Sequence, residues 1–240
     1  MPGVRIGCSG FNYPHWKGIF YPQGLPQNKW LQYYCTVFST VELNVTFYRL
    51  PLPATFDKWY QETPPDFEFS LKGSRFITHI KKLIDPAEPL SLFFKSALQL
   101  KEKLKVVLWQ FPPQFKINAA RLIKFLRLLR DYPVRNTLEF RHESWITEDV
   151  INICKEHAVS LCMADWPEFI DDLPVTSDFI YIRRHGEGGG YDTCYSKAAL
   201  KKDAKRINSY LKESRDVFLY FNNDAFGYAP KNARELIELL

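Results

Sequence analysis

Short runs of apolar and β-branched residues recur eight times along the chain, and each run is bounded by polar residues, proline or glycine. Runs of this length and composition are typical of strands buried in a parallel sheet. We therefore predict strands at Val4–Ser9, Thr40–Asn44, Phe67–Lys72, Val106–Gln110, Thr137–Arg141, Ser160–Ala164, Phe179–Arg183 and Val217–Phe221.

Most of the segments between these runs repeat their apolar residues at intervals of three and four, the period of an amphipathic helix. The clearest is Ala119–Arg130, which has leucine and phenylalanine on one face and arginine and lysine on the other. Proline suits the first helical turn, and Ser, Thr and Asn suit the N-cap. Helices are accordingly expected to begin at or just after Pro26, Pro53, Pro89, Asn118, Thr147, Ser196 and Pro230. Residues 165–177 lack the pattern, so an irregular connection is expected there.

Alternation of strands and helices predicts a parallel sheet, and eight such units predict closure into a (β/α)8 TIM barrel. The chain has 240 residues, close to the roughly 250 that are typical of this fold. No internal repeat, linker or low-complexity segment divides the sequence. We therefore predict a single domain over residues 1–240.

Polar residues end almost every predicted strand, and successive side chains of a strand point to opposite faces. Most of these polar residues share one face of their strand, and Asp165 is assigned to the same face as Leu161 and Met163. If that face points inward, the groups meet at the C-terminal mouth of the barrel, where barrel enzymes carry their catalytic residues. The residues are Glu42, Asn44, Ser70, Lys72, Gln110, Glu139, Arg141, Asp165, Tyr181, Arg183, His185, Tyr220, Asn222 and Asp224.

This cluster mixes carboxylates with cations, so it can bind an anion and also supply an acid or a base. We expect Glu139 or Asp165 to act as general base or acid, with His185 as the partner. Glu42 is a further catalytic candidate. The alternative is a structural role for each of them. Glu42 would then pair with a neighbouring cation and Glu139 with Arg141, while Asp165 would cap a turn and His185 would be hydrogen-bonded in the core.

An anionic ligand would be held by Lys72, Arg141 and Arg183, with Arg75 nearby. The turn Gly186–Gly190 follows the seventh strand, where a glycine-rich turn can offer backbone N–H groups to an oxyanion. A flexible loop is the alternative for this turn. The expected aromatic wall of the pocket is formed by Tyr13, Trp16, Tyr48 and Trp145. The polar groups expected to contact the rest of the ligand are those of Asn44, Gln110, Asn222 and Asp224.

A basic segment, residues 72–82, follows the third strand and interleaves Lys72, Arg75, His79, Lys81 and Lys82 with the ring of Phe76. Cations and rings in this arrangement can bind single-stranded nucleic acid. A solvated basic loop is the alternative. The formal net charge of +5 permits an anionic ligand or nucleic acid but requires neither.

Several classes of protein are disfavoured. Five cysteines without a CxxC pair are best explained as reduced thiols of a cytoplasmic protein. No signal peptide and no apolar run of membrane length is found, so we expect no membrane partner. Neither a Walker loop nor a dinucleotide fingerprint is present, and the His, Asp and Glu spacing does not support a divalent-metal site. The cofactor, the metal dependence and the oligomeric state are left undetermined.

The sequence resembles the YecE-like family, domain of unknown function 72, along essentially its whole length. The matching segments are Ile6–Gly10, Tyr13–Trp16, Phe20–Pro22, Val41–Tyr48, Lys72, Arg75–His79, Gln110–Pro113, Glu139–Trp145, Ala164–Asp165, Tyr181–Gly186 and Tyr220–Asp224. The resemblance implies a (β/α)8 barrel without an established activity. Its shape is similar to the xylose isomerase and endonuclease IV group, whose members bind metals and act on sugars or DNA. Arg184 stands where the family usually has an apolar residue, and its parity points away from the pocket.

Three functions remain open at this stage. The first is an enzyme of hydrolase, isomerase or lyase type that acts on a small anionic or phosphorylated, hydroxyl-rich substrate. The second is a nucleic-acid-binding or nucleic-acid-processing protein that uses the basic segment. The third is a non-catalytic sensor of a metabolite. The sequence alone does not separate the first from the third.

Overall fold

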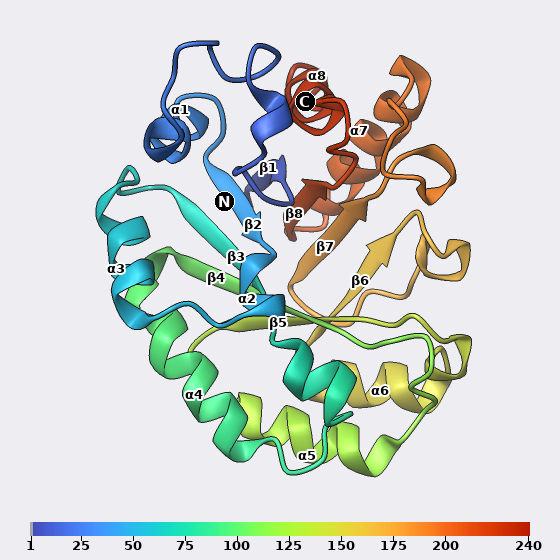
Figure 1. Cartoon of the computed structure of the whole chain (residues 1–240). Helices are drawn as coiled ribbons and strands as arrows, with labels where there is room; N and C mark the ends of the chain where they lie inside the picture. The colour runs from blue at the N-terminus through green and yellow to red at the C-terminus, as the bar shows by residue number, and fades with distance from the viewer. Residues whose placement is uncertain (1) are drawn as a thin grey trace.

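The computed structural model describes residues 2–240 and shows eight parallel strands around one axis with helices outside them (Figure 1). Each strand pairs with its sequence neighbour, and β1 also pairs with β8. β1 and β2 meet through a parallel bridge between Ser9 and Glu42, so the barrel is nearly closed. The TIM-barrel prediction is thereby confirmed. The strands are β1 Val4–Cys8, β2 Thr40–Leu43, β3 Glu68–Lys72, β4 Leu104–Gln110, β5 Arg135–Glu139, β6 Ser160–Ala164, β7 Phe179–Arg184 and β8 Asp216–Phe221.

All eight strands lie within two residues of their predicted bounds at both ends. β5 both begins and ends two residues earlier than predicted, because Arg135 pairs with Val106 and Glu139 with Gln110 of β4. Arg141 therefore stands just beyond the strand, on the loop at the mouth. This shift leaves the predicted face unchanged, since two residues is one full period of a strand.

The helices are α1 Trp30–Cys35, α2 Val45–Tyr48, α3 Pro53–Gln61, α4 Ala87–Ala97, α5 Ala119–Leu129, α6 Glu148–Glu156, α7 Lys197–Lys212 and α8 Tyr228–Ile237. The predicted caps Asn118, Thr147 and Ser196 all accept a hydrogen bond from the third residue of their helix. α4 and α8 begin two residues before their prolines, which still lie in the first turn. Residues 165–177 contain only a short 3-10 turn, as expected. Within residues 2–240, no helix combines the length and apolar character needed to cross a membrane.

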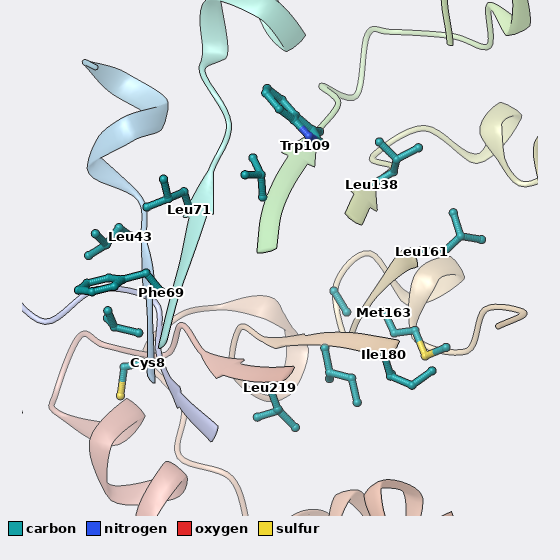
Figure 2. Packing of buried hydrophobic residues seen from close by; sticks show 14 of the residues in the cluster. Cys8, Leu43, Phe69, Leu71, Trp109, Leu138, Leu161, Met163, Ile180 and Leu219 are labelled. Atoms are coloured by element: carbon teal, nitrogen blue, oxygen red, sulfur yellow. The ribbon is translucent and has the colours of Figure 1, made fainter. Parts of the chain in front are cut away.

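Two apolar layers form the core. The larger one lies between the strands and the helices, and Figure 2 shows Leu43, Leu71, Leu138 and Leu219 among the side chains packed in it. The smaller one fills the inside of the barrel. It consists of Val106, Leu108, Cys162, Phe179, Tyr181, Phe218 and Tyr220. The inside of the barrel is therefore a packed core.

Candidate functional site

A cavity of about 710 Å³ opens at the C-terminal ends of the strands. This volume lies within the range of roughly 300–1,000 Å³ of small-molecule sites. Ten of the thirteen predicted substrate-binding residues line it: Tyr13, Asn44, Tyr48, Lys72, Arg75, Gln110, Arg141, Arg183, Asn222 and Asp224. The other lining residues are Phe47, His79, Pro113, Trp166 and Tyr191. The shared face of the strand ends thus correctly predicts most of the cavity wall.

The cavity is strongly cationic. Its lining includes Lys72, Arg75, Arg141 and Arg183, against a single carboxylate, Asp224. A cleft lined by one sign of charge and walled by apolar side chains focuses its field and attracts ligands of opposite charge. Two of these cations, Arg141 and Arg183, are paired with the buried carboxylates Glu139 and Glu42, so the unpaired positive charge of the lining comes from Lys72 and Arg75.

Beneath the cavity lies a buried charge network that we call the floor network, formed by Glu42, Glu139, Arg141, Arg183 and His185. Arg183 is at its centre, with only 1 % of its side chain exposed. Its Nη2 lies 2.9 Å from Glu42 Oε1, and its Nη1 lies 2.9 Å from Glu139 Oε2. One guanidinium is thus clamped between two carboxylates, which fixes its position before any ligand arrives.

Glu42 and Glu139 are fully buried and have all their oxygens engaged. Glu42 accepts hydrogen bonds from the Ser9 hydroxyl at 2.5 Å and from the Tyr181 hydroxyl at 2.7 Å, besides those from Arg183. Glu139 accepts from Gln110 Nε2 at 2.7 Å and pairs with Arg141. Neither carboxylate lines the cavity. Their placement favours the structural alternative over the catalytic role expected from the sequence.

Electrostatics supports that interpretation of Glu139. Burial raises the pKa of its carboxyl, but Arg141 and Arg183 outweigh burial and hold the pKa well below its ordinary value. A carboxylate kept ionised in this way is a poor proton acceptor. Glu139 is therefore better suited to hold the two arginines than to act as a general base.

His185 is fully buried, and its ring connects Asp165 to the two arginines. Nδ1 lies 3.2 Å from Asp165 Oδ1, while Nε2 lies 3.2 Å from Arg141 Nη2 and 3.2 Å from Arg183 Nη1. Guanidinium nitrogens only donate, so Nε2 must accept and the proton must reside on Nδ1. Burial lowers the pKa of His185, and the nearby Arg183 opposes protonation further. The imidazole is thus a neutral spacer that orients both guanidiniums.

The expectation that Asp165, Leu161 and Met163 share a face that points into the barrel is wrong. Leu161 and Met163 pack in the outer layer, as Figure 2 shows, and Cys162 of the same strand points into the barrel. Asp165 lies outside the cavity lining, where Oδ1 accepts from the His185 backbone N–H at 2.9 Å and Oδ2 accepts from the Tyr195 hydroxyl. Burial raises its pKa, but the hydrogen bonds from His185 and Tyr195 leave it below the ordinary value. Asp165 anchors the end of β7.

Three predicted binding residues lie away from the cavity. Trp16 is buried, and its Nε1 donates to the Asp224 carbonyl oxygen at 3.0 Å. Trp145 is buried against Phe140, with ring centroids 5.1 Å apart. The Gly186 N–H donates to the Tyr195 hydroxyl at 2.7 Å, so it is not free for an anion. These expectations are wrong because the groups concerned are already engaged by the protein itself.

The aromatic wall consists instead of Tyr13, Phe47, Tyr48, Trp166 and Tyr191. Trp166 lies on the loop after β6, and the Arg141 guanidinium carbon is 4.9 Å from its ring centroid. Arg141 Nη1 also donates to the Trp166 carbonyl oxygen at 2.9 Å. Trp166 was not identified from the sequence. Trp166 follows the end of β6, and position after a strand end is the pattern that predicts the other lining residues. The same pattern could have predicted Trp166.

Asn44 carries the clearest unmet polar group in the cavity. Its Oδ1 is buried and has no hydrogen-bond partner among the described residues. A buried acceptor without a donor is costly, so such groups mark places where a ligand or solvent donates.

The basic segment divides between the cavity and the surface. Arg75 and His79 line the cavity with Lys72, whereas Phe76 is 43 % exposed and Lys81 Nζ lies 5.7 Å from its ring centroid. Burial lowers the pKa of His79 to about 4, assisted by Lys72 and Arg75. His79 is therefore neutral at physiological pH. Across residues 2–240, no cluster of three or more His, Cys, Asp or Glu is placed to hold a metal ion.

Comparisons with known proteins agree with the barrel fold. A protein of unknown function from Thermotoga maritima, whose crystal structure is known, is 32 % identical over 99 % of this chain and 98 % of its own, with a TM-score of 0.86. D-psicose 3-epimerase, with 9 % identity and a TM-score of 0.54 over 90 % of this chain and 91 % of its own, shares the barrel fold alone.

A curated relative and a family model identify the chain. The UPF0759 protein YunF of Bacillus subtilis is 30 % identical over 99 % of this chain and 94 % of its own length. Residues 5–240 match the model described as protein of unknown function DUF72. The resemblance seen in the sequence is thus confirmed, and the chain belongs to the DUF72 family.

Proposed function

We propose that this protein is an enzyme that binds a small anionic, hydroxyl-rich molecule in the mouth cavity and acts on it by acid–base chemistry. One observation carries the proposal: four cationic side chains and one carboxylate face a cavity of small-molecule size, and the floor network holds two of those cations in place. A site with its charges fixed in advance loses little free energy to reorganisation when it binds.

The anion would contact Arg75, Arg141 and Lys72, because Arg183 is held by Glu42 and Glu139 beneath them. Arginine suits phosphate and carboxylate because its planar fork can donate two parallel hydrogen bonds. Arg75 is exposed and forms no ion pair among the described residues, so its guanidinium is available to a ligand. Hydroxyl groups of the same ligand would meet Asn44 and Asn222, and the aromatic wall would exclude water.

Asp224 is the best-placed acid or base, because it is the one carboxylate among the lining residues that the structure describes. Burial raises the pKa of its carboxyl above the ordinary value. A raised pKa brings a carboxyl closer to the pH at which it can both accept and donate a proton. In this proposal Asp224 takes the part first expected of Glu139 or Asp165, and those two residues position the site.

The test measures binding by calorimetry and turnover by mass spectrometry. Inorganic phosphate and a panel of sugar phosphates are compared in the native protein, Arg75→Gln and Arg127→Gln, the last being an exposed arginine of α5 and a matched control. Loss of a charged hydrogen bond costs about 1.5–3 kcal/mol, so Arg75→Gln should weaken binding at least tenfold and Arg127→Gln should not. Asp224→Asn should abolish turnover and retain binding.

Each alternative has its own outcome. Equal affinity in the two arginine variants, or no binding of any phosphorylated compound, would overturn the anion site. Binding without turnover of any compound in the panel would leave a sensor and reject the enzyme. Binding of short oligonucleotides alone, weakening steeply as salt is raised, would transfer the function to the basic segment.

A further inference from the structure

Two lysines of this chain have buried side chains, Lys72 and Lys103, and their surroundings differ sharply. Lys103 Nζ donates to the carbonyl oxygens of Tyr60 at 2.7 Å and Thr63 at 2.8 Å, and it lies 3.0 Å from Thr63 Oγ1. All three of its protons are therefore used, as expected of a structural ammonium. Lys103 shows how this protein satisfies a buried lysine that has no other task.

Lys72 lacks any such arrangement. Its residue is 8 % exposed and lines the cavity, and among residues 2–240 its Nζ forms no hydrogen bond or ion pair with a protein oxygen. Its nearest favourable contact is the ring of Phe47, whose centroid is 4.3 Å from Nζ. The carboxylates of the floor network are already committed to arginines. The side chain of Lys72 is thus largely buried, while its amine end is unpaired and open to the cavity where a ligand would lie.

These surroundings disfavour the charged ammonium. Burial and the neighbouring Arg183 lower the pKa of Lys72 to about 8. An ordinary lysine has a pKa near 10.4, so at neutral pH Lys72 holds a fraction of free amine larger by roughly 100-fold or more. The free amine is the nucleophilic form, and burial beside other cations is a known way to activate a lysine.

We propose that Lys72 forms a Schiff base with the carbonyl carbon of an anionic aldehyde or ketone bound in the mouth cavity. This inference rests on the proposed function and names the substrate class: open-chain sugar phosphates and 2-oxo acids. The Lys72 nitrogen attacks the carbonyl carbon, so that a C–N bond forms while the C=O π bond breaks, and transfer of a proton from the nitrogen to the oxygen gives a carbinolamine. Protonation of that hydroxyl, by the Asp224 carboxyl or by solvent, lets it leave as water while the nitrogen lone pair completes the C=N bond.

The consequence is an electron sink at the cavity. The iminium withdraws electrons from the neighbouring carbon, which makes its C–H or C–C bond easier to break. Arg75 and Arg141 would hold the anionic end of the molecule and set which carbon meets Nζ. A lysine in this role suits isomerase or lyase chemistry on a hydroxylated carbonyl compound.

The experiment uses pyridoxal 5′-phosphate, an anionic aldehyde, as the probe and borohydride to reduce the C=N bond to a stable amine. Peptide mass mapping then locates the label in the native protein, in Lys72→Met and in Lys81→Met, an exposed lysine of the same segment as the control. We expect one label per chain, at Lys72, lost in Lys72→Met and retained in Lys81→Met. Pyridoxal without the phosphate should label Lys72 at least tenfold more slowly, and inorganic phosphate should protect it.

The native protein alone decides the proposal, even if Lys72→Met fails to fold. Label spread over exposed lysines, with phosphate still bound in the calorimeter, would overturn the Schiff base and leave the anion site standing. Label confined to Lys72 but unaffected by phosphate would support the reactive amine and overturn the anion site. Absence of both phosphate binding and selective labelling would overturn both.

Discussion

Replacing Glu42 by glutamine should strongly destabilise the barrel, although the two side chains have nearly the same shape. Glu42 neutralises Arg183, whose Nε lies 3.1 Å from Oε2 and whose Nη2 lies 2.9 Å from Oε1, and both side chains are almost wholly removed from water. Glutamine retains one oxygen acceptor but removes the charge. Arg183 would then depend on Glu139 alone for neutralisation.

The size of the effect follows from that burial. Breaking a buried ion pair by removing one partner typically costs about 3–5 kcal/mol, because the remaining charge cannot reach water. For a chain of this length each 1 kcal/mol shifts the melting temperature by roughly 2–4 °C. The expected decrease in the melting temperature of Glu42→Gln is therefore about 6–20 °C.

The assay is thermal unfolding followed by circular dichroism, with Glu213→Gln as the matched control. Glu213 pairs with Arg215 at 3.2 Å, but its side chain is 56 % exposed. Exposed pairs contribute about 0–1 kcal/mol, so the control should change the melting temperature by no more than about 4 °C. A Glu42→Gln protein that melts within that same interval would refute the argument that the floor network is buried and charged.

The remaining predictions concern pH and packing. The pKa of Glu139 in the folded protein lies well below its ordinary 4.5, so its carboxylate contributes fully to stability above pH 4.5 and loses this contribution on acidification. In urea titrations, the difference in unfolding free energy between the native protein and Glu139→Gln should therefore shrink below pH 4.5. The pKa of His79 is about 4 in the folded protein against an ordinary 6.5, so the buried neutral ring contributes fully to stability above pH 6.5 and loses this contribution as the pH falls toward 4. His79→Asn should flatten that part of the stability–pH curve, and an unchanged slope would contradict a buried, neutral His79. A Cβ on Gly73 would lie 2.2 Å from the Trp109 ring, whereas one on Gly24 would meet nothing within 4 Å; Gly73→Ala should cost about 1–3 kcal/mol of unfolding free energy and Gly24→Ala almost none.

The sequence predicts the barrel well because the patterns that indicate strands and helices depend on residues close together in the chain. Apolar runs, prolines and N-caps each act over a few residues, and repetition of the same unit eight times makes the fold class plain. Faces are predicted where polar and apolar side chains alternate along a strand. β6 offers no such marker, because all five of its residues are buried. The face of Asp165 could not be inferred from it.

The other errors concern contacts made across the fold. Trp16 and Trp145 stand next to motif residues, but only tertiary packing decides whether a large ring lines a pocket or fills the core. The N–H of Gly186 is taken by Tyr195, from a loop nine residues later in the chain. The floor network is the main case: the sequence indicates that its charges meet, but leaves open whether they pair with one another or act on a ligand.

The floor network also has a consequence for how the chain reaches its native state. Arg183 lies 141 residues from Glu42 and 44 from Glu139 along the chain. During synthesis both carboxylates emerge long before their common partner, and proteins fold from the N-terminal end as they are made. A truncated chain that ends before β7 would leave Glu42 without a counter-ion, whereas Glu139 would keep Arg141 but lose Arg183. Completion of the cavity and closure of the barrel are therefore expected to be one late, cooperative event in folding.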